Sequence, residues 1–188
     1  MERLIQEFGP PDFTPEQNYF EALVRAIIFQ QLSGKAAGTI LKRFLNLFEV
    51  KRFPSPKEVL SIDLTNLRSA GLSGQKIRYL RDLSEKWEQI QSKLENSESM
   101  TDEEIRSALL KVKGIGPWTV DMFLMFTLNR PDVFPALDLG IRKGFRQLQG
   151  DTHLPSPETV GQAAEKWRPY RTVAAWYLWK VVDGPFAW

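Results

Sequence analysis

The sequence predicts an all-α protein, and two observations carry that prediction. Apolar residues recur three and four positions apart over long stretches, as in Ile77, Leu80, Leu83 and Trp87, which is the spacing of one helix face. No stretch shows the sustained alternation of apolar and polar residues that marks a half-buried strand. Most of the chain is therefore expected to be helical.

Helix-start signals divide the chain into elements. In a capping box, a hydroxyl residue and a Glu or Gln three positions later each accept a hydrogen bond from the other's backbone amide. Three segments fit this pattern: Thr14-Pro15-Glu16-Gln17, Ser55-Pro56-Lys57-Glu58 and Thr101-Asp102-Glu103-Glu104. A fourth segment, Ser156-Pro157-Glu158, places proline at the first helical position. Helices are expected near residues 15–32, 34–48, 56–61, 74–95, 102–112, 117–128, 138–149, 157–167 and 169–182.

The composition excludes several classes of protein. The chain has 188 residues, 43% of them hydrophobic, which is enough for the core of one domain. It has no cysteine, so disulfides, thiolate metal sites and cysteine-ligated iron–sulfur clusters are excluded. The charged N-terminus resembles neither a signal peptide nor a membrane span. A net charge of +2 does not by itself indicate nucleic-acid binding.

The most informative segment is Leu110–Asp138, which begins with a glycine turn. Two glycines flank Ile115, so the backbone can turn sharply and approach a ligand closely, and Pro117 suits the first position of the next helix. Lys111 and Lys113 alternate with apolar neighbours and are expected to face phosphate. An ordinary turn between two helices is the alternative for an isolated glycine pair.

Four segments together resemble the helix-hairpin-helix DNA glycosylase superfamily, and within it the 3-methyladenine DNA glycosylase II (alkylpurine) family. They are Tyr19–Ala37, Gly71–Leu83, Leu110–Asp138 and Trp167–Trp179. The resemblance implies one domain over residues 1–188, built as two helical lobes, with the helix-hairpin-helix at about residues 102–128. It also implies a short form, in which the β-rich N-terminal domain of larger members is expected to be missing.

The resemblance assigns the catalytic carboxylate to Asp138. A carboxylate near the sugar can stabilise the oxocarbenium-like state formed when an N-glycosidic bond breaks, and it can orient a water. The alternative is that Asp138 only caps the helix that it begins.

Aromatic side chains are expected to receive the flipped base. Trp118 and Trp179 match pocket tryptophans of the alkylpurine family, and an indole face attracts a cationic alkylpurine. Core packing is the alternative for Trp179. Met122 stands where a relative has an aromatic residue, and Phe29 is a further candidate ring. Trp118 also occupies the position where relatives that cleave the DNA backbone carry a Schiff-base lysine, which implies a monofunctional enzyme.

The remaining site assignments concern DNA and a cation. The resemblance implies that Gln30, Gln31 and Leu32 fill the space that the flipped base leaves in the duplex. The alternative is that these residues are only the end of a helix. The residues expected to bind the DNA backbone are Lys111, Lys113, Gly114, Gly116, Arg142 and Lys143. A structural monovalent cation, Na⁺ or K⁺, is expected on the main-chain carbonyls of Leu110, Val112 and Ile115, and no other cofactor is expected.

The sequence thus predicts a monofunctional DNA glycosylase that excises alkylated purines of the 3-methyladenine and 7-methylguanine type from duplex DNA in base excision repair. A glycosylase for a deaminated or oxidised base and a non-catalytic helix-hairpin-helix DNA-binding module are the alternatives. The expected partner is double-stranded DNA containing damaged bases, with no membrane partner. The expected form is a monomer, intracellular, in the cytoplasm of a prokaryote or the nucleus of a eukaryote.

Overall fold

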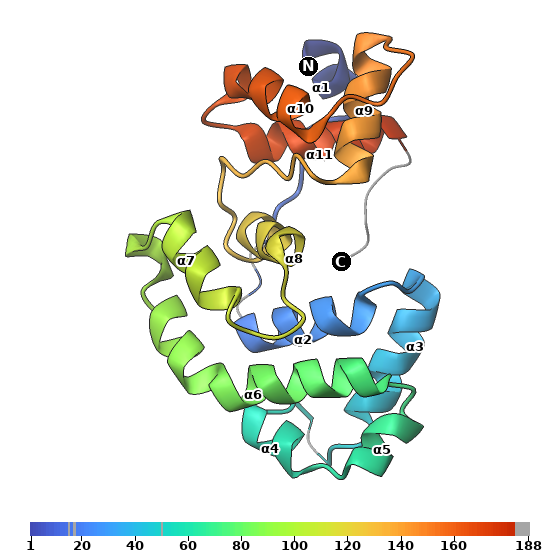
Figure 1. The fold of residues 1–188 in the computed structure, drawn as a ribbon, viewed down its shortest axis with the longest axis vertical. Coiled ribbons are helices and arrows are strands. Elements are labelled where there is room, and N and C mark those ends of the chain that lie inside the picture. Colours follow the sequence, from blue (N-terminus) through green and yellow to red (C-terminus); the bar gives the residue numbers. More distant parts are fainter. Residues whose placement is uncertain (15, 17, 50, 183–188) are drawn as a thin grey trace. The chain divides into compact units, whose positions relative to one another are not determined.

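The described part of the chain is helical, as predicted. The computed structural model describes residues 1–182 other than 15, 17 and 50, and these residues form eleven α-helices and no strand. They divide into two compact units (Figure 1). One unit is Glu16–Val120, and the other joins Met1–Pro15 to Asp121–Trp188. The prediction of one domain with two lobes stays a prediction.

The unit Glu16–Val120 is organised around one long helix. Its elements are α2 (Tyr19–Phe29), α3 (Gly34–Leu45), α4 (Pro56–Ser61), α5 (Leu64–Ser69), α6 (Gly74–Leu94), a 3-10 turn (Ser97–Ser99), α7 (Asp102–Leu109) and the start of α8 (Pro117–Met122). The helix α6 packs against α2, α4, α5 and α7, and its buried Leu80 and Leu83 share the core with Leu23 and Ile27 of α2.

The other unit is organised around the last helix. Its elements are α1 (Glu2–Phe8), a π-helical turn (Phe123–Thr127), α9 (Leu139–Gln149), α10 (Pro157–Ala164), a 3-10 turn (Glu165–Trp167) and α11 (Arg171–Val182). Tyr177 and Leu178 of α11 are fully buried, and α11 packs most extensively against α9. Gly144 permits that approach, because a Cβ there would lie 2.0 Å from the carbonyl oxygen of Leu178.

Three of the four predicted helix starts are confirmed. Capping boxes form at Ser55 with Glu58 and at Thr101 with Glu104, and Ser156 caps α10 ahead of Pro157. The start predicted at Thr14 is wrong, because Asn18 caps α2 through the amide of Glu21 and the helix begins at Tyr19. Positions 15 and 17 of that predicted start lie outside the described residues.

Most predicted helices are found, and most differences in their bounds lie at helix ends, although the helix expected over 117–128 becomes π-helical from Phe123. The helix expected over 102–112 stops at Leu109, the one over 15–32 stops at Phe29, and the one over 157–167 closes as a 3-10 turn after Ala164. The helices α1 and α5 were not predicted. They have seven and six residues, which is too short for apolar periodicity to register.

Candidate functional site

Asp138 caps α9 and is held by two hydrogen bonds. Its Oδ1 accepts from the backbone N–H of Ile141 at 2.8 Å and from the indole N–H of Trp179 at 2.8 Å. The capping role is therefore confirmed. A capping role does not exclude catalysis, because one carboxylate can both cap a helix and face a substrate. The catalytic role itself stays a prediction.

The start of α11 holds the other end of the segment that leads to Asp138. The Thr172 hydroxyl donates to the carbonyl oxygen of Arg130 at 2.6 Å and accepts from the N–H of Val133 at 3.0 Å. The Thr172 N–H donates to the carbonyl oxygen of Pro131 at 3.0 Å. Because Trp179 is two turns further along α11, one helix fixes both ends of the segment 130–138.

An ion-pair network braces the same segment. Arg171 donates to Asp132 from Nε to Oδ1 at 2.7 Å and from Nη2 to Oδ2 at 3.0 Å, and Arg168 reaches Oδ2 at 2.6 Å. Burial alone would raise the pKa of Asp132, but the hydrogen bonds and charge of Arg171 outweigh it and lower that pKa. Asp132 is thus ionised and fixed near the start of the segment.

Trp179 is buried next to Asp138. The residue is 4% exposed, and its ring lies 6.0 Å from that of Phe126, centroid to centroid. Gly140 leaves room for it, because a Cβ there would lie 2.9 Å from Trp179 Cδ1. Its role as a wall of the base pocket stays a prediction, and the indole N–H has a definite role in holding Asp138. Met122, in the same unit, is also buried.

The glycine hairpin is anchored to α6 by a buried carboxylate. Asp82 Oδ2 accepts from the backbone N–H of Lys113 at 2.8 Å and from the Lys86 ammonium at 2.8 Å. The Lys113 ammonium lies 3.6 Å from Oδ1. Burial would raise the pKa of Asp82, but the hydrogen bonds and charges of Lys86 and Lys113 lower it. The Lys113 backbone amide is thus committed to Asp82 rather than open to phosphate.

The two hairpin glycines have different surroundings. Gly114 has a φ of +84°, and a Cβ there would lie 2.1 Å from the Tyr79 ring. A Cβ on Gly116 would meet nothing within 4 Å. Gly114 is therefore required by the fold, whereas Gly116 offers an open main chain to a ligand. The predicted place of Pro117 at the start of α8 is confirmed.

The end of α2 is tied to the hairpin. The Gln30 side-chain amide donates to the carbonyl oxygen of Gly114 at 2.8 Å, and the Lys76 ammonium donates to the carbonyl oxygens of Ile28 and Gln30 at 2.6 Å and 2.9 Å. Burial lowers the pKa of Lys76. Gln31 follows with a φ of +58°, and Leu32 is 40% exposed. These hydrogen bonds hold the end of α2 in a defined position, and the role of Gln30, Gln31 and Leu32 in filling the hole left by a flipped base stays a prediction.

A cavity of about 430 Å³ lies beside this junction, within the unit Glu16–Val120. Its lining is Gln30, Gln31, Ser73, Gln75, Lys76, Tyr79, Gly114, Gly116, Trp118 and Thr119. The structure therefore brings together five predicted site residues from the turn after α2, the hairpin and α8. Phe29 belongs to the same unit but does not line the cavity.

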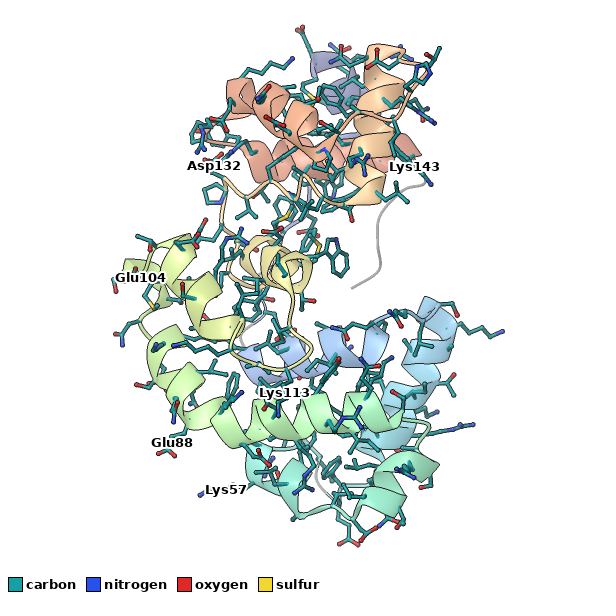
Figure 2. The ribbon with its side chains drawn as sticks, viewed as in Figure 1. Lys57, Glu88, Glu104, Lys113, Asp132 and Lys143 are labelled. Atoms are coloured by element: carbon teal, nitrogen blue, oxygen red, sulfur yellow. The ribbon has the colours of Figure 1, made fainter. Side chains whose placement is uncertain are left out.

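The predicted basic contacts on α9 differ from each other. Arg142 is half-buried, and its Nε donates to the carbonyl oxygen of Pro155 at 2.9 Å, so it also braces the loop before α10. Lys143 is exposed (Figure 2). Only Lys143 is therefore wholly available at the surface.

The cation site on the main-chain carbonyls of Leu110, Val112 and Ile115 stays a prediction. Leu110 is the C-cap of α7, where helix carbonyls carry partial negative charge that suits a cation. The Val112 carbonyl also accepts from the N–H of Ile115 at 3.1 Å. Among the described residues, no group of three or more His, Cys, Asp or Glu side chains offers an alternative metal site.

Sequence reasoning missed the residues that hold the site in place. Asp82 carried one signal, because it is an acid within the apolar pattern of α6. Lys76 belongs to the Gly71–Leu83 segment, but nothing in the sequence indicates that its ammonium caps α2. A capping or bracing role for Asp132 is predictable from its place in the loop, but its partner Arg171 is 39 positions away, and sequence alone does not pair them.

Comparisons with known proteins agree with this arrangement. The chain is 39% identical to DNA-3-methyladenine glycosylase 1 of Schizosaccharomyces pombe over 180 residues, covering 95% of this chain and 78% of that protein. A solved structure of the Schizosaccharomyces pombe 3-methyladenine DNA glycosylase in complex with abasic DNA has a TM-score of 0.82 at 40% identity, covering 95% of this chain and 89% of that one. A DNA-3-methyladenine glycosidase from Bacillus halodurans has a TM-score of 0.86 at 33% identity, covering 97% and 83%.

The family model agrees as well. The model that describes the HhH-GPD superfamily base excision DNA repair protein matches residues 24–169, which include the end of α2, the hairpin and Asp138. Because this match spans most of the chain, the protein belongs to the HhH-GPD superfamily of base excision DNA repair proteins.

Proposed function

We propose that this protein is a monofunctional DNA glycosylase that excises alkylated purines from duplex DNA. The observation that carries the proposal is Asp138, a carboxylate at the start of α9 that two hydrogen bonds on Oδ1 fix in place. The relatives from Schizosaccharomyces pombe and Bacillus halodurans are both named for 3-methyladenine, and the former was solved with abasic DNA.

In the proposed reaction, the bond between the sugar C1′ and the base nitrogen breaks and its electron pair leaves with the base. An alkylated purine is cationic, so it leaves as a neutral base and needs no strong acid. Positive charge develops on the sugar, and the Asp138 carboxylate stabilises it and orients the water that adds to C1′. The proton of that water passes to solvent or to the carboxylate.

Trp118 supports the monofunctional assignment. Its side chain has no amine, so the residue cannot form the Schiff base through which bifunctional relatives cleave the backbone. Its half-buried ring lines the cavity with Gln30 and Gln31, which is consistent with a site that contacts unstacked bases.

The cation and the location of the protein are further parts of the proposal. A Na⁺ or K⁺ held by the carbonyls of Leu110, Val112 and Ile115 would add positive charge where the hairpin meets phosphate, without a role in hydrolysis. Among the described residues, no helix is long and apolar enough to cross a membrane. We expect the protein where its substrate is, in the cytoplasm of a prokaryote or the nucleus of a eukaryote.

Product analysis tests the function. The protein is incubated with duplexes that carry 3-methyladenine, 7-methylguanine, hypoxanthine or uracil, and the released base is identified by mass spectrometry. Release of the two alkylpurines without strand cleavage is expected. Release of only hypoxanthine or uracil would assign another lesion, and binding without release from any duplex would favour a non-catalytic module.

A further inference from the structure

A second basic feature lies beside the hairpin, in a groove between α6 and α7. The groove has a volume of about 110 Å³. Its lining is Lys86, Gln89, Ile90, Lys93, Ala108 and Lys111. Three of these six residues are lysines and none is acidic. The four residues from α6 are spaced three and four apart, so they form one face of that helix, and Glu88 lies on the opposite face.

Lys86 is held in place with a donor to spare. Its ammonium donates to Asp82 Oδ2 at 2.8 Å and to the carbonyl oxygen of Lys111 at 2.6 Å. An ammonium has three N–H donors, so one remains beyond these two bonds. Asp82 is buried and Lys86 lines the groove. The bond to this buried carboxylate therefore holds the Lys86 ammonium at the groove wall before any ligand binds.

The other two lysines add charge that the described part of the chain does not neutralise. Asp82 is shared by Lys86 and Lys113, whereas neither Lys93 nor Lys111 has a carboxylate at salt-bridge distance among the described residues. Lys93 and Lys111 are both exposed. The groove thus combines one ammonium group held by hydrogen bonds and two exposed ones around a space of about 110 Å³.

We propose that this groove binds a phosphate of the DNA backbone, next to those bound at the hairpin. The inference rests on the proposed function for its partner. Continuity with the hairpin favours DNA, because Lys111 is both a groove residue and the first basic residue of the hairpin, and Lys86 bonds its carbonyl directly. A contact of this kind positions the duplex and carries no sequence information.

Salt dependence of binding tests the proposal. Lys93→Gln and Lys111→Gln each remove one groove charge, and the latter keeps the carbonyl that Lys86 binds. With undamaged duplex, loss of one phosphate contact should reduce the slope of log K against log salt by about 0.9. Between about 50 and 200 mM salt, the affinity of such a variant should therefore fall about threefold less than that of the wild type. Lys57→Gln is the matched control, since Lys57 is an exposed lysine on α4 of the same unit and its loss should leave the slope unchanged (Figure 2).

A gain of charge gives an independent arm. Gln89 is exposed and lines the groove, so Gln89→Lys should tighten duplex binding and steepen the slope. Because Lys111 is also a hairpin residue, Lys93→Gln and Gln89→Lys decide the role of the groove. Unchanged slopes in both, with each variant folded by circular dichroism, would overturn the proposal.

Inorganic phosphate distinguishes a free anion from DNA. It is titrated into the protein while the backbone amides of Ile90 and Ala108 are followed by NMR. Saturable shifts together with reduced duplex slopes support the proposal, whereas shifts without any slope change would mean that the groove takes free anions only and would overturn it. Excision at saturating DNA is measured in parallel. Because undamaged duplex decides the groove, its failure and the failure of the glycosylase assignment are separable.

Discussion

Asp138 caps α9 and is the proposed catalytic carboxylate, and two substitutions separate these roles. Asparagine keeps an oxygen at the position of Oδ1, so it can still accept from the Ile141 amide and the Trp179 indole. Asparagine and aspartate are comparable N-caps, so Asp138→Asn should change the free energy of unfolding by less than about 1 kcal/mol. What it removes is the negative charge.

Alanine removes the structural role as well. Loss of the cap costs about 0.5–2 kcal/mol, and a buried indole N–H left without its acceptor costs about 1–3 kcal/mol. The sum centres near about 3 kcal/mol, which lowers the Tm by about 6–12 °C for a chain of this size. Asp138→Ala should therefore be destabilised, whereas Asp138→Asn should not.

Single-turnover excision of 7-methylguanine from duplex DNA measures the catalytic role. Loss of the charge that faces the developing cation should slow Asp138→Asn about a hundredfold or more, equivalent to about 2.7 kcal/mol, while duplex affinity stays near the wild-type value. If Asp138→Asn is folded, binds DNA and excises within a factor of a few of wild type, Asp138 is a helix cap alone and the carboxylate mechanism is wrong.

The remaining predictions concern the hairpin, the tryptophans and Asp82. Borohydride should trap no covalent protein–DNA adduct, because Trp118 stands where the Schiff-base lysine would be; a specific adduct would show that another amine serves. Gly116→Ala should fold normally and weaken binding to damaged and undamaged duplex alike, whereas Gly114→Ala should lower the free energy of unfolding by about 1–3 kcal/mol, because its Cβ would collide with Tyr79. Selective loss of lesion binding in Gly116→Ala would contradict a phosphate-binding hairpin. Trp179→Phe keeps a ring but loses the indole N–H, so it should slow excision of all lesions about tenfold or more while duplex affinity stays unchanged. Trp176→Phe on the same helix is the control. A loss of activity confined to cationic lesions would instead make Trp179 a wall of the base pocket. The pKa of Asp82 is lowered on folding, so the stability that Asp82 contributes is present above the ordinary carboxyl pKa of about 4 and is lost as the pH falls below it. Asp82→Asn should therefore make the Tm depend less on pH in the acid range. An unchanged dependence of Tm on pH would argue against Asp82 as the anchor of the hairpin.

The sequence predicted the parts of the fold that local chemistry decides. Capping boxes at Ser55 and Thr101 need only neighbouring residues, and they were found where predicted. The start of α2 was misplaced because Thr14 and Asn18 both offer good caps, and only packing of the helix chooses between them.

The candidate site was predictable only in part, for the same reason. Glycines, a proline and an aspartate at fixed offsets mark the hairpin and Asp138, so both were located from the sequence. The groups that hold them, Asp82, Lys76 and Arg171, act across 31 to 48 positions of sequence. Such pairs depend on how helices pack, and a single sequence does not encode them in any local pattern.

Gly140 and Gly144 of α9 have a consequence for the direction in which Asp138 faces. Both are positions where a side chain would collide with α11, one with the Trp179 ring and one with the Leu178 main chain. Spaced four apart, they mark a single line along α9, so only one rotational phase of that helix lets it seat against α11. Asp138 is the residue immediately before α9, so the direction in which it faces depends on the lack of side chains at Gly140 and Gly144. A glycine-to-alanine change that would strengthen an isolated helix would here force α9 and α11 to shift apart or repack, next to the carboxylate.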